Sequence, residues 1–552
     1  MKKLIAMMLA LVMTLSLFVA CGGNDSSAGG NQGGSNGGSE GIVKLTIGLP
    51  TSATVMSYKD NAMTKWLEEK CGVDLEFIPY AGGTDIATQI ATTAAANQPL
   101  PDILFGISLG DEVYRSYGKD GYFADLTPLY EDREGASKIF WTRIAETFTA
   151  EEQADIERKL RDPESGKIYT VPTMDTTMID IMDYQPWINT EWLDYLKLDM
   201  PTDPDSLYKV LKAFQTGDPN QNGNADEIPL YGGQEAGLGA DVINWLINMF
   251  LYFNDRKHFS IDEDGQVYAP FITDEYRKAL QYVNKLISEK LMPDSVFNTA
   301  MTEMPVITTP PSGKAKVGIF VGHLTIHADC ENEVLKQYQP LPIWGNAVFN
   351  DNRFNANCFI GGDCKNVEKA FEVMMTIWSE EGSRRIRYGE YGVNWTDADP
   401  GAKSPLGLDA KFKLLKDPLQ QMNTCLWSGA SCTLCVNAEK EDAQLAEELK
   451  PGEKLREELH AISYANFKKA YEENNPDPKY ICPTLVLTEE EKEDTKPQRE
   501  GCADYYKKSR TAFCTGEMDP NSNAKWEEYK KTLWDLGLQD WLDVAQVAYD
   551  RY

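Results

Sequence analysis

A short loop in the middle of the chain has the residue types and spacing of a calcium-binding loop. It reads Asp218-Pro219-Asn220-Gln221-Asn222-Gly223-Asn224-Ala225-Asp226-Glu227, with side-chain oxygens at positions one, three and five, glycine at six and an acid at nine. This matches the start of an EF-hand loop, where alternate residues converge on one hard cation. Position twelve, normally a bidentate glutamate, is Pro229, so Glu227 would have to complete the ligand set. The loop predicts a structural Ca²⁺ site, although Asn- and Gly-rich turns also form without metal.

A second group of residues combines aromatic rings with hydrogen-bonding side chains, as sugar binding requires. These candidates follow predicted strands or lie in loops: Tyr58, Ser108, Gln234, Glu235, Trp245, His323, Trp344 and Trp395. Each aromatic ring could also pack in a core. The expected positions of the three tryptophans, in or beside loops, favour ligand contact. His323 and His327 have metal-ligand spacing only if helical, and no carboxylate lies between them, which disfavours a metal there.

One motif supports an enzyme as the alternative. Gly106-Ile107-Ser108-Leu109-Gly110 is a GxSxG directly after a predicted strand, the setting of a hydrolase nucleophile elbow. A triad also needs an acid and one of the four histidines, and the HGGG-type oxyanion motif is missing. Matches of five residues arise by chance, and glycines at a strand end also let backbone N–H groups approach a ligand. We therefore expect no catalysis, with a Ser108 hydrolase as the alternative.

The N-terminal residues are typical of an exported lipoprotein. Two lysines precede an apolar run over 4–20, which is short for a membrane-spanning helix. Phe18-Val19-Ala20-Cys21 then resembles a lipobox, and the Gly/Ser/Asn-rich 22–41 should be a flexible tether. We expect residues 1–20 to be a cleaved signal peptide and Cys21 to carry a lipid (palmitate) anchor. The working domain would then sit on the extracytoplasmic face of the cell membrane.

Charge and cysteine content limit the other functions. Lysine and arginine number 54 against 85 acidic residues, a net charge of −31, which repels phosphate backbones and disfavours nucleic-acid binding. Apart from Cys21, ten of the eleven cysteines remain, an even number that permits disulfides without requiring them in so large a domain. Cys432-Thr433-Leu434-Cys435 is a single CxxC, which is weak evidence for a zinc or redox site.

Strands alternating with helices should position these residues. Apolar patterns predict strands over 42–50, 73–80, 101–106, 228–232 and 317–321, and helices over 61–70, 85–97 and 523–552. Such an order favours parallel sheets, whose ligands bind beyond the carboxyl ends of the strands. The segment 42–552 is longer than one hydrophobic core usually supports, so two lobes are expected.

The order of these motifs resembles the family 1 extracellular solute-binding lipoproteins of ABC carbohydrate importers. The segments that carry the resemblance are Cys21 with its tether, Pro101–Gly106, Trp187–Leu193, the 218–227 loop and Trp541–Tyr552. The similarity runs from about Ile42 to the end. The chain is most similar to the large oligosaccharide-binding members, including alginate-binding proteins, which carry a calcium loop of this kind.

The resemblance implies an α/β periplasmic-binding-protein-like fold with two hinged lobes, each a mostly parallel sheet flanked by helices. Lobe 1 would span about 42–170 plus a segment near 350–440, and lobe 2 about 175–345 plus the C-terminal helices. The family implies a monomer that captures an oligosaccharide between the lobes and delivers it to an ABC permease. Peptides or other polar solutes remain alternative ligands. The implied calcium ligands are Asp218, Asn220, Asn222, the backbone carbonyl of Asn224, Asp226 and Glu227.

Overall fold

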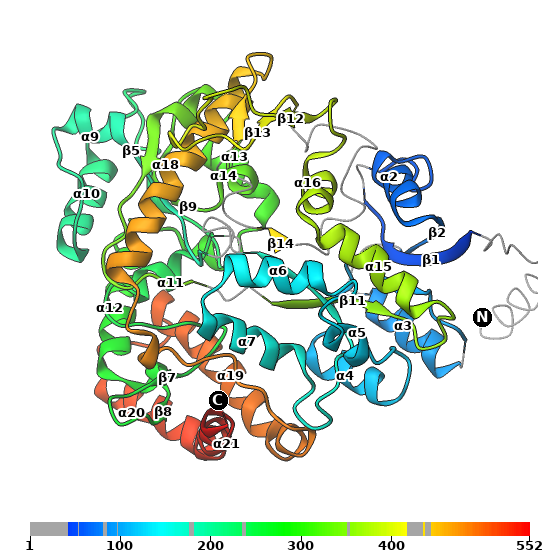
Figure 1. Ribbon diagram of the computed structural model, residues 1–552. Coiled ribbons are helices and arrows are strands. Elements are labelled where there is room, and N and C mark those ends of the chain that lie inside the picture. The colour runs from blue at the N-terminus through cyan, green and yellow to red at the C-terminus, as the bar shows by residue number, and fades with distance from the viewer. Residues whose placement is uncertain are drawn as a thin grey trace, which may run out of the picture. The chain divides into compact units, whose positions relative to one another are not determined.

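The computed structural model describes residues 42–52, 55–80, 85–96, 98–175, 182–234, 239–349, 354–416, 434–435 and 443–551. The chain divides into two units, Met1–Ile42 and Val43–Tyr552, and the second unit holds all the elements described below (Figure 1). The signal peptide, Cys21 and the tether predicted from the sequence lie outside the described residues. Within the described part, no helix is long and apolar enough to cross a membrane.

The first sheet has six strands in the order β14, β4, β11, β3, β1, β2. β1 (Val43–Pro50) is parallel to β2 (Val73–Tyr80) and to β3 (Ile103–Leu104), and β4 (Val171–Asp175) is parallel to β14 (Leu434–Cys435). β11 (Asn355–Ile360) lies antiparallel between β3 and β4. A late segment of the chain therefore completes a sheet that the first 175 residues begin.

Helices cover this sheet and close its core. α2 (Ala62–Cys71) begins at Asn61, whose side chain accepts a hydrogen bond from the Met63 N–H, and ends at Gly72 in the left-handed conformation. α15 (Val367–Trp378) packs against α2, α6 (Lys138–Thr147) and β11, and its apolar side chains join the core built by 45–175 and 358–386. The helices of this part are α3 (Asp85–Ala95), α4 (Asp111–Lys119), α5 (Thr127–Glu131), α6 (Lys138–Thr147), α7 (Ala150–Leu160) and α16 (Glu380–Tyr388).

The second sheet has four strands in the order β10, β5, β9, β6. β5 (Pro186–Asn189) is antiparallel to β10 (Tyr338–Pro340) and to β9 (Val317–Val321), and only β9 with β6 (Ile228–Tyr231) is parallel. The expectation of a mostly parallel sheet therefore fails here. The reason is connectivity: β5 brings the chain in from the first sheet and β10 leads back to it, so the two neighbours run in opposite directions.

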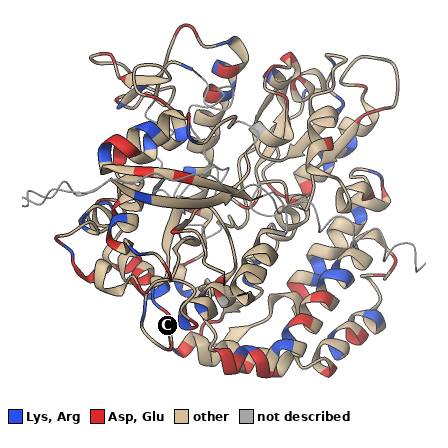
Figure 2. Ribbon diagram, turned by 90° about the vertical axis from the view of Figure 1, so that its right-hand side faces the viewer, with Lys and Arg blue, Asp and Glu red and all other residues tan. Residues whose placement is uncertain are grey.

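The C-terminal helices belong to the core of the second sheet. α19 (Glu489–Thr515) packs against α12 (Asp274–Ser288) and α21 (Leu538–Asp550), and this core draws on 182–348 and 459–545. Acidic and basic residues are interspersed along the helices of the described chain (Figure 2). The other helices of this part are α9 (Thr190–Leu196), α10 (Pro204–Thr216), α11 (Val242–Ile247), α13 (Met304–Thr308), α14 (Leu324–His327), α18 (Pro451–Asn474) and α20 (Asn523–Asp535), with single 3₁₀ turns at Pro270–Ile272, Asp294–Phe297, Met301–Glu303, Glu333–Gln337 and Pro478–Tyr480.

Two small sheets complete the fold. β7 (Ser260–Ile261) and β8 (Val267–Tyr268) form a hairpin, and β12 (Trp395–Asp397), β13 (Phe412–Leu414) and β15 (Ala443–Leu445) form a three-stranded sheet with its own small core. The cysteines with described side chains are all free thiols: Cys71, Cys330, Cys358, Cys364, Cys482, Cys502 and Cys514. Of the CxxC motif, the structure describes only backbone, at 434–435.

Candidate ligand and cation sites

The Asp218–Glu227 loop connects α10 to β6, and α10, which precedes the loop, packs closely against β9. Gly318 in β9 leaves room for Phe214 of α10, since a Cβ at position 318 would lie 2.2 Å from the ring. Within the loop, Asp218 and Gly223 both adopt positive φ, 46° and 75°. The backbone therefore turns back on itself directly after α10.

This curled backbone brings four of the predicted calcium ligands together. The Asp218 carboxylate accepts hydrogen bonds from the backbone N–H groups of Asn222 (3.1 Å) and Gly223 (3.2 Å). Asp226 accepts from the side-chain amides of Asn220 (3.3 Å) and Asn222 (2.8 Å), and its other oxygen lies 2.9 Å from the Lys316 ammonium. Asp226 is thus surrounded by positive and N–H groups, which lower the pKa of its carboxyl, the Lys316 contact contributing most.

The third acidic ligand, Glu227, has an unusual setting. Its Oε1 atom is buried and makes no hydrogen bond within the described structure. Burial raises the pKa of Glu227, and the neighbouring charges of Asp226 and Asp218 raise it further. Asn224 is exposed, and its backbone N–H donates to the Asn222 side chain at 2.7 Å.

The loop residues fit a hard cation by donor type. Carboxylate and amide oxygens are the ligands that Ca²⁺ prefers, and an unpartnered buried carboxylate oxygen is stabilised by a positive charge. Among the described residues, no three His, Cys, Asp or Glu side chains already converge as a metal site. A cation here would therefore take its remaining ligands from the two asparagine amides, which now donate N–H groups to Asp226.

Three candidate sugar ligands follow the carboxyl ends of strands in the two sheets. Ser108 follows β3 and is exposed, Gln234 follows β6, and His323 follows β9. The Gln234 Nε2 group is buried without a hydrogen-bond partner in the described structure. Glu235, the next residue, lies outside the described residues. The polar candidates therefore lie at strand ends, as expected for a ligand site beyond the carboxyl edges of the sheets.

Two of the predicted aromatic ligands instead pack in cores, which corrects the prediction for them. Trp245 is 1% exposed, and Trp395 is 4% exposed and donates its indole N–H to the Gly389 carbonyl at 2.9 Å. Neither ring has a face left for a sugar. Trp344 is half-buried, tilts against Trp245 at 6.1 Å between centroids and donates to the Pro201 carbonyl. Its partial exposure keeps it a candidate.

Tyr58 lies between the end of β1 and the edge strand β2. Its ring stacks on Phe77 at 5.5 Å, and its hydroxyl accepts from the Ser52 N–H (2.9 Å) and donates to the Pro50 carbonyl (3.2 Å). The hydroxyl is thus fully used in holding the loop after β1. One face of the half-buried ring lines an open pocket and remains accessible.

The four histidines have their own partners, and the described contacts pair none of them with Ser108. The His323 backbone N–H donates to His327 Nδ1 at 2.8 Å, and the His323 ring packs against His460 at 5.6 Å. His258 bonds to Tyr506 at 2.7 Å. A Ser-His pair, the requirement for a hydrolase elbow, is therefore not among the described interactions.

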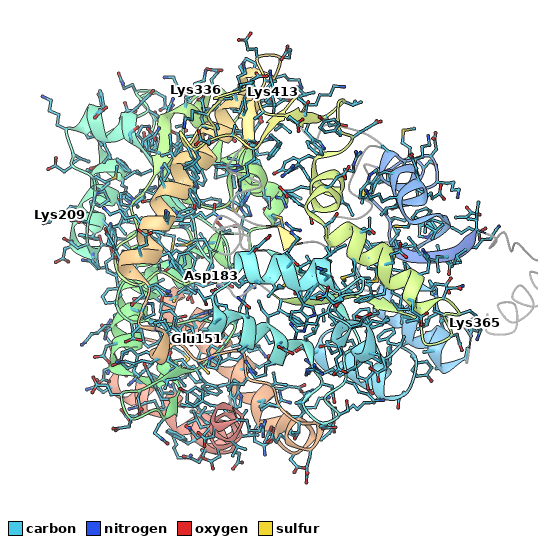
Figure 3. All side chains as sticks on the ribbon, in the orientation of Figure 1. Glu151, Asp183, Lys209, Lys336, Lys365 and Lys413 are labelled. Carbon is cyan, nitrogen blue, oxygen red and sulfur yellow. The ribbon has the colours of Figure 1, made fainter. Side chains whose placement is uncertain are left out.

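Sequence patterns missed a buried acidic pair. Asn244 bonds to Asp183 through its side chain and to Asp241 through its backbone N–H. Both acids are 1% exposed (Asp183 is labelled in Figure 3), and burial raises the pKa of Asp241 to about 8, with Arg510 opposing the shift and Asp183 adding to it. Neither acid belongs to a spaced motif, so only the fold brings them together.

Comparison with known proteins gives relatives along almost the whole chain, although no family model matches. The fructooligosaccharide ABC transporter substrate-binding protein FusA of Streptococcus pneumoniae is 23% identical, across 98% of this chain and 97% of its own. Among solved structures, an HMO-binding ABC-transporter-associated solute-binding protein from Bifidobacterium longum infantis superposes with a TM-score of 0.73 at 19% identity, covering 93% of this chain and 99% of that one. The fold is that of an ABC-transporter solute-binding protein.

A second solved structure bears on the resemblance to alginate-binding proteins that the sequence indicated. Alginate-binding protein AlgQ2, solved without calcium ion, matches with a TM-score of 0.62 at 20% identity, covering 92% of this chain and 98% of that one. These relatives are binding proteins, as the order of the motifs predicted, and not hydrolases. The two-lobe α/β fold is therefore confirmed.

Proposed function

We propose that the chain is the extracytoplasmic receptor of an ABC importer and binds an oligosaccharide between its two lobes. The observation that carries the proposal is the whole-length match of both sheets to solute-binding proteins, described by their names as binders of HMO and fructooligosaccharides. Candidate polar contacts come from both sheets: Ser108 from the first, and Gln234 and His323 from the second. The unpartnered Gln234 amide is suited to a sugar hydroxyl.

Ligand binding of this kind is coupled to a movement of the two lobes. A ligand that touches groups on both lobes stabilises the closed arrangement relative to the open one, and so shifts the population toward closure. A permease that recognises only the closed receptor would then accept loaded molecules. We propose that the protein acts as a monomer, held at the membrane by a lipid on Cys21 with residues 21–41 as tether.

The same proposal includes a structural Ca²⁺ ion in the Asp218–Glu227 loop. Calcium would neutralise Asp218, Asp226 and Glu227, supplying the positive charge that the Glu227 carboxylate lacks. Because the loop joins α10 to β6, the ion would fix the start of β6, the edge strand that pairs with β9. Its role would be stability of the second lobe and not chemistry.

A thermal-shift screen tests the ligand class. The chain without residues 1–41 would be heated with neutral oligosaccharides, acidic oligosaccharides and short peptides at matched concentrations. A ligand at 100 times its dissociation constant stabilises by about 2.7 kcal/mol. We expect stabilisation by at least one oligosaccharide. Stabilisation by peptides alone would replace the sugar with the alternative ligand class.

A further inference from the structure

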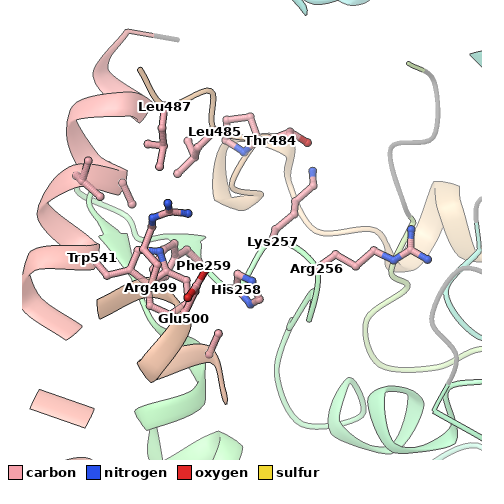
Figure 4. A pocket seen from close by; sticks show the side chains of 14 residues that line it. Arg256, Lys257, His258, Phe259, Thr484, Leu485, Leu487, Arg499, Glu500 and Trp541 are labelled. Carbon is pink, nitrogen blue, oxygen red and sulfur yellow. The ribbon is translucent and has the colours of Figure 1, made fainter. Parts of the chain in front are cut away.

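A separate pocket of about 470 Å³ lies among the C-terminal helices of the second lobe (Figure 4). Its apolar walls come from the β7 region, the 483–487 segment, α19 and α21, and include Phe259, Leu485, Leu487 and Trp541. The volume suits a small molecule. None of the candidate oligosaccharide contacts lines it.

The charge at the pocket runs against that of the whole chain. Three cationic residues line it, Arg256, Lys257 and Arg499, against a single acid, the exposed Glu500, whereas the chain carries a net charge of −31. Figure 4 shows Arg499 beside the apolar side chains Trp541 and Phe259, and Arg256 pointing away from them. An anion would be favoured at this place on an otherwise acidic protein.

Arg499 is held in place by neutral groups. Its Nε donates to the Thr495 hydroxyl at 3.1 Å and one Nη donates to the Lys492 carbonyl at 3.0 Å. Pro497 lies inside α19 and lacks an N–H, so one backbone hydrogen bond of the helix is missing close to the Thr495 hydroxyl and the Lys492 carbonyl. These two hydrogen bonds fix the position of the guanidinium, and neither acceptor is a carboxylate.

A chain of hydrogen bonds sets the state of His258 in the pocket wall. Asp255 pairs with the buried Arg510 at 3.3 Å; although burial opposes it, Arg510 keeps the pKa of Asp255 below its usual value. An ionised Asp255 only accepts, so the Tyr506 hydroxyl donates to it at 2.7 Å. The Tyr506 oxygen then accepts from His258 Nδ1–H, also at 2.7 Å.

Because Nδ1 carries the proton, His258 Nε2 has a free lone pair and can accept a hydrogen bond. His258 is one of the residues that line the pocket. Burial lowers the pKa of His258 to about 4, so the ring is neutral at physiological pH. His258 also has a φ of 64°, a left-handed conformation that is uncommon for histidine. The pocket thus offers three features together: an apolar wall, a fixed cation and a hydrogen-bond acceptor.

We propose that this pocket is a second ligand site, separate from the oligosaccharide site, that binds the carboxylate of an N-acylated apolar amino acid. The carboxylate would lie against Arg499, the amide N–H would donate to His258 Nε2, and the apolar side chain would rest on Phe259 and Leu485. A carboxylate with an adjacent N–H and an apolar group matches all three features at once.

Three probes and three variants test this proposal by ligand-observed NMR titration. The probes are N-acetylphenylalanine, its primary amide, which lacks the charge, and 3-phenylpropanoate, which lacks the N–H. The protein would be the chain without residues 1–41, which retains the unit Val43–Tyr552. Arg499→Gln removes the cation, Ala503→Phe fills the pocket, and Lys508→Gln is the control, because Lys508 is an exposed cation on the same helix.

We expect N-acetylphenylalanine to bind about tenfold more tightly than its amide, and 3-phenylpropanoate to bind several-fold more weakly than N-acetylphenylalanine. Arg499→Gln should remove the advantage of the acid, Ala503→Phe should abolish binding of all three, and Lys508→Gln should change nothing. Equal binding of acid and amide would overturn the proposal. So would binding that survives Ala503→Phe, or no binding of the acid at millimolar concentration. Oligosaccharide binding should be unchanged in all three variants, which shows that they are folded.

Discussion

Two polar regions of the second lobe leave hydrogen-bonding atoms unpaired, and they do so in opposite settings. The Asp218–Glu227 loop is partly exposed and gathers negative charge around the unpartnered Glu227 Oε1. The histidine cluster consists of the buried His323 and His327 and the half-buried His460, and the buried Nε2 atoms of His327 and His460 are unpaired within the described structure. The loop would suit a cation, whereas burial disfavours even a proton on the histidines of the cluster.

The comparison shows how burial affects whether an unpaired polar group carries a charge. In the cluster, burial lowers the pKa of His323 and of His327 to about 4, and nearby cationic groups add to the shift for His323. In the loop, water reaches most of the carboxylates, so they can remain charged and bind an ion. The two regions should therefore respond to different changes in the solution.

The largest effect should come from acid. A histidine whose pKa is about 4 when folded and about 6.5 when unfolded contributes stability that is complete above pH 6.5 and lost as the pH falls toward 4. The loss is roughly 2 kcal/mol per buried histidine by pH 4.5. Denaturant unfolding followed between pH 7.5 and 4.5 measures this decline only against a variant that lacks the histidine, because the buried Asp241, whose pKa is raised to about 8, gains stability over the same range.

His327→Gln isolates one histidine from the other titrating groups. Glutamine can accept the His323 backbone N–H as His327 Nδ1 does, but it does not titrate. The variant should lose less stability than the wild type over the same pH range. Equal losses would show that His327 does not stay neutral in the folded protein.

Removing calcium should have the next largest effect. If Ca²⁺ at 100 times its dissociation constant stabilises the fold by about 2.7 kcal/mol, a chelator should lower the melting temperature by a few degrees. Asp226→Ala removes a central ligand and should make the protein insensitive to chelator. Asp264→Ala, an exposed acid in the β7–β8 turn, is the matched control and should keep the wild-type response. A wild type that ignores chelator would remove the calcium site.

Lys316 should have the smallest effect, because it is a partly exposed partner of Asp226. Lys316→Met removes a charge that competes with calcium, so it should cost less than about 1 kcal/mol without calcium and tighten calcium binding. Isothermal titration with Ca²⁺ would measure the change. Weaker calcium binding in the variant would mean that Lys316 supports the site and does not compete for it.

Single strands and loops could be predicted from the sequence, whereas contacts between distant segments could not. The strands Val73–Tyr80 and Val317–Val321 match their predicted bounds, because apolar pattern and flanking glycines are local signals. The curled 218–227 loop follows from its own spacing. Trp245 and Trp395 were misassigned, because they lie in α11 and β12 and not in loops, and because the sequence does not show which distant residues will cover a ring.

The same limit explains what sequence reasoning missed. His258, Tyr506, Asp255 and Arg510 come from segments about 250 residues apart and form one network only through packing of α19 on the second lobe. The pair of Asp183 and Asp241 is assembled in the same way. No spacing rule links such residues, so only a three-dimensional structure reveals them.

The central claim is that this chain binds an oligosaccharide and does not alter it. Isothermal titration of the chain without residues 1–41 with the most stabilising sugar from the thermal screen, followed by mass spectrometry of the recovered glycan, tests it most directly. We predict one site per chain and an intact sugar, with Ser108→Ala changing affinity by no more than one hydrogen bond, about 0.5 to 1.5 kcal/mol. Cleavage of the glycan that is lost in the Ser108 variant, or the absence of binding to every oligosaccharide, would contradict the account.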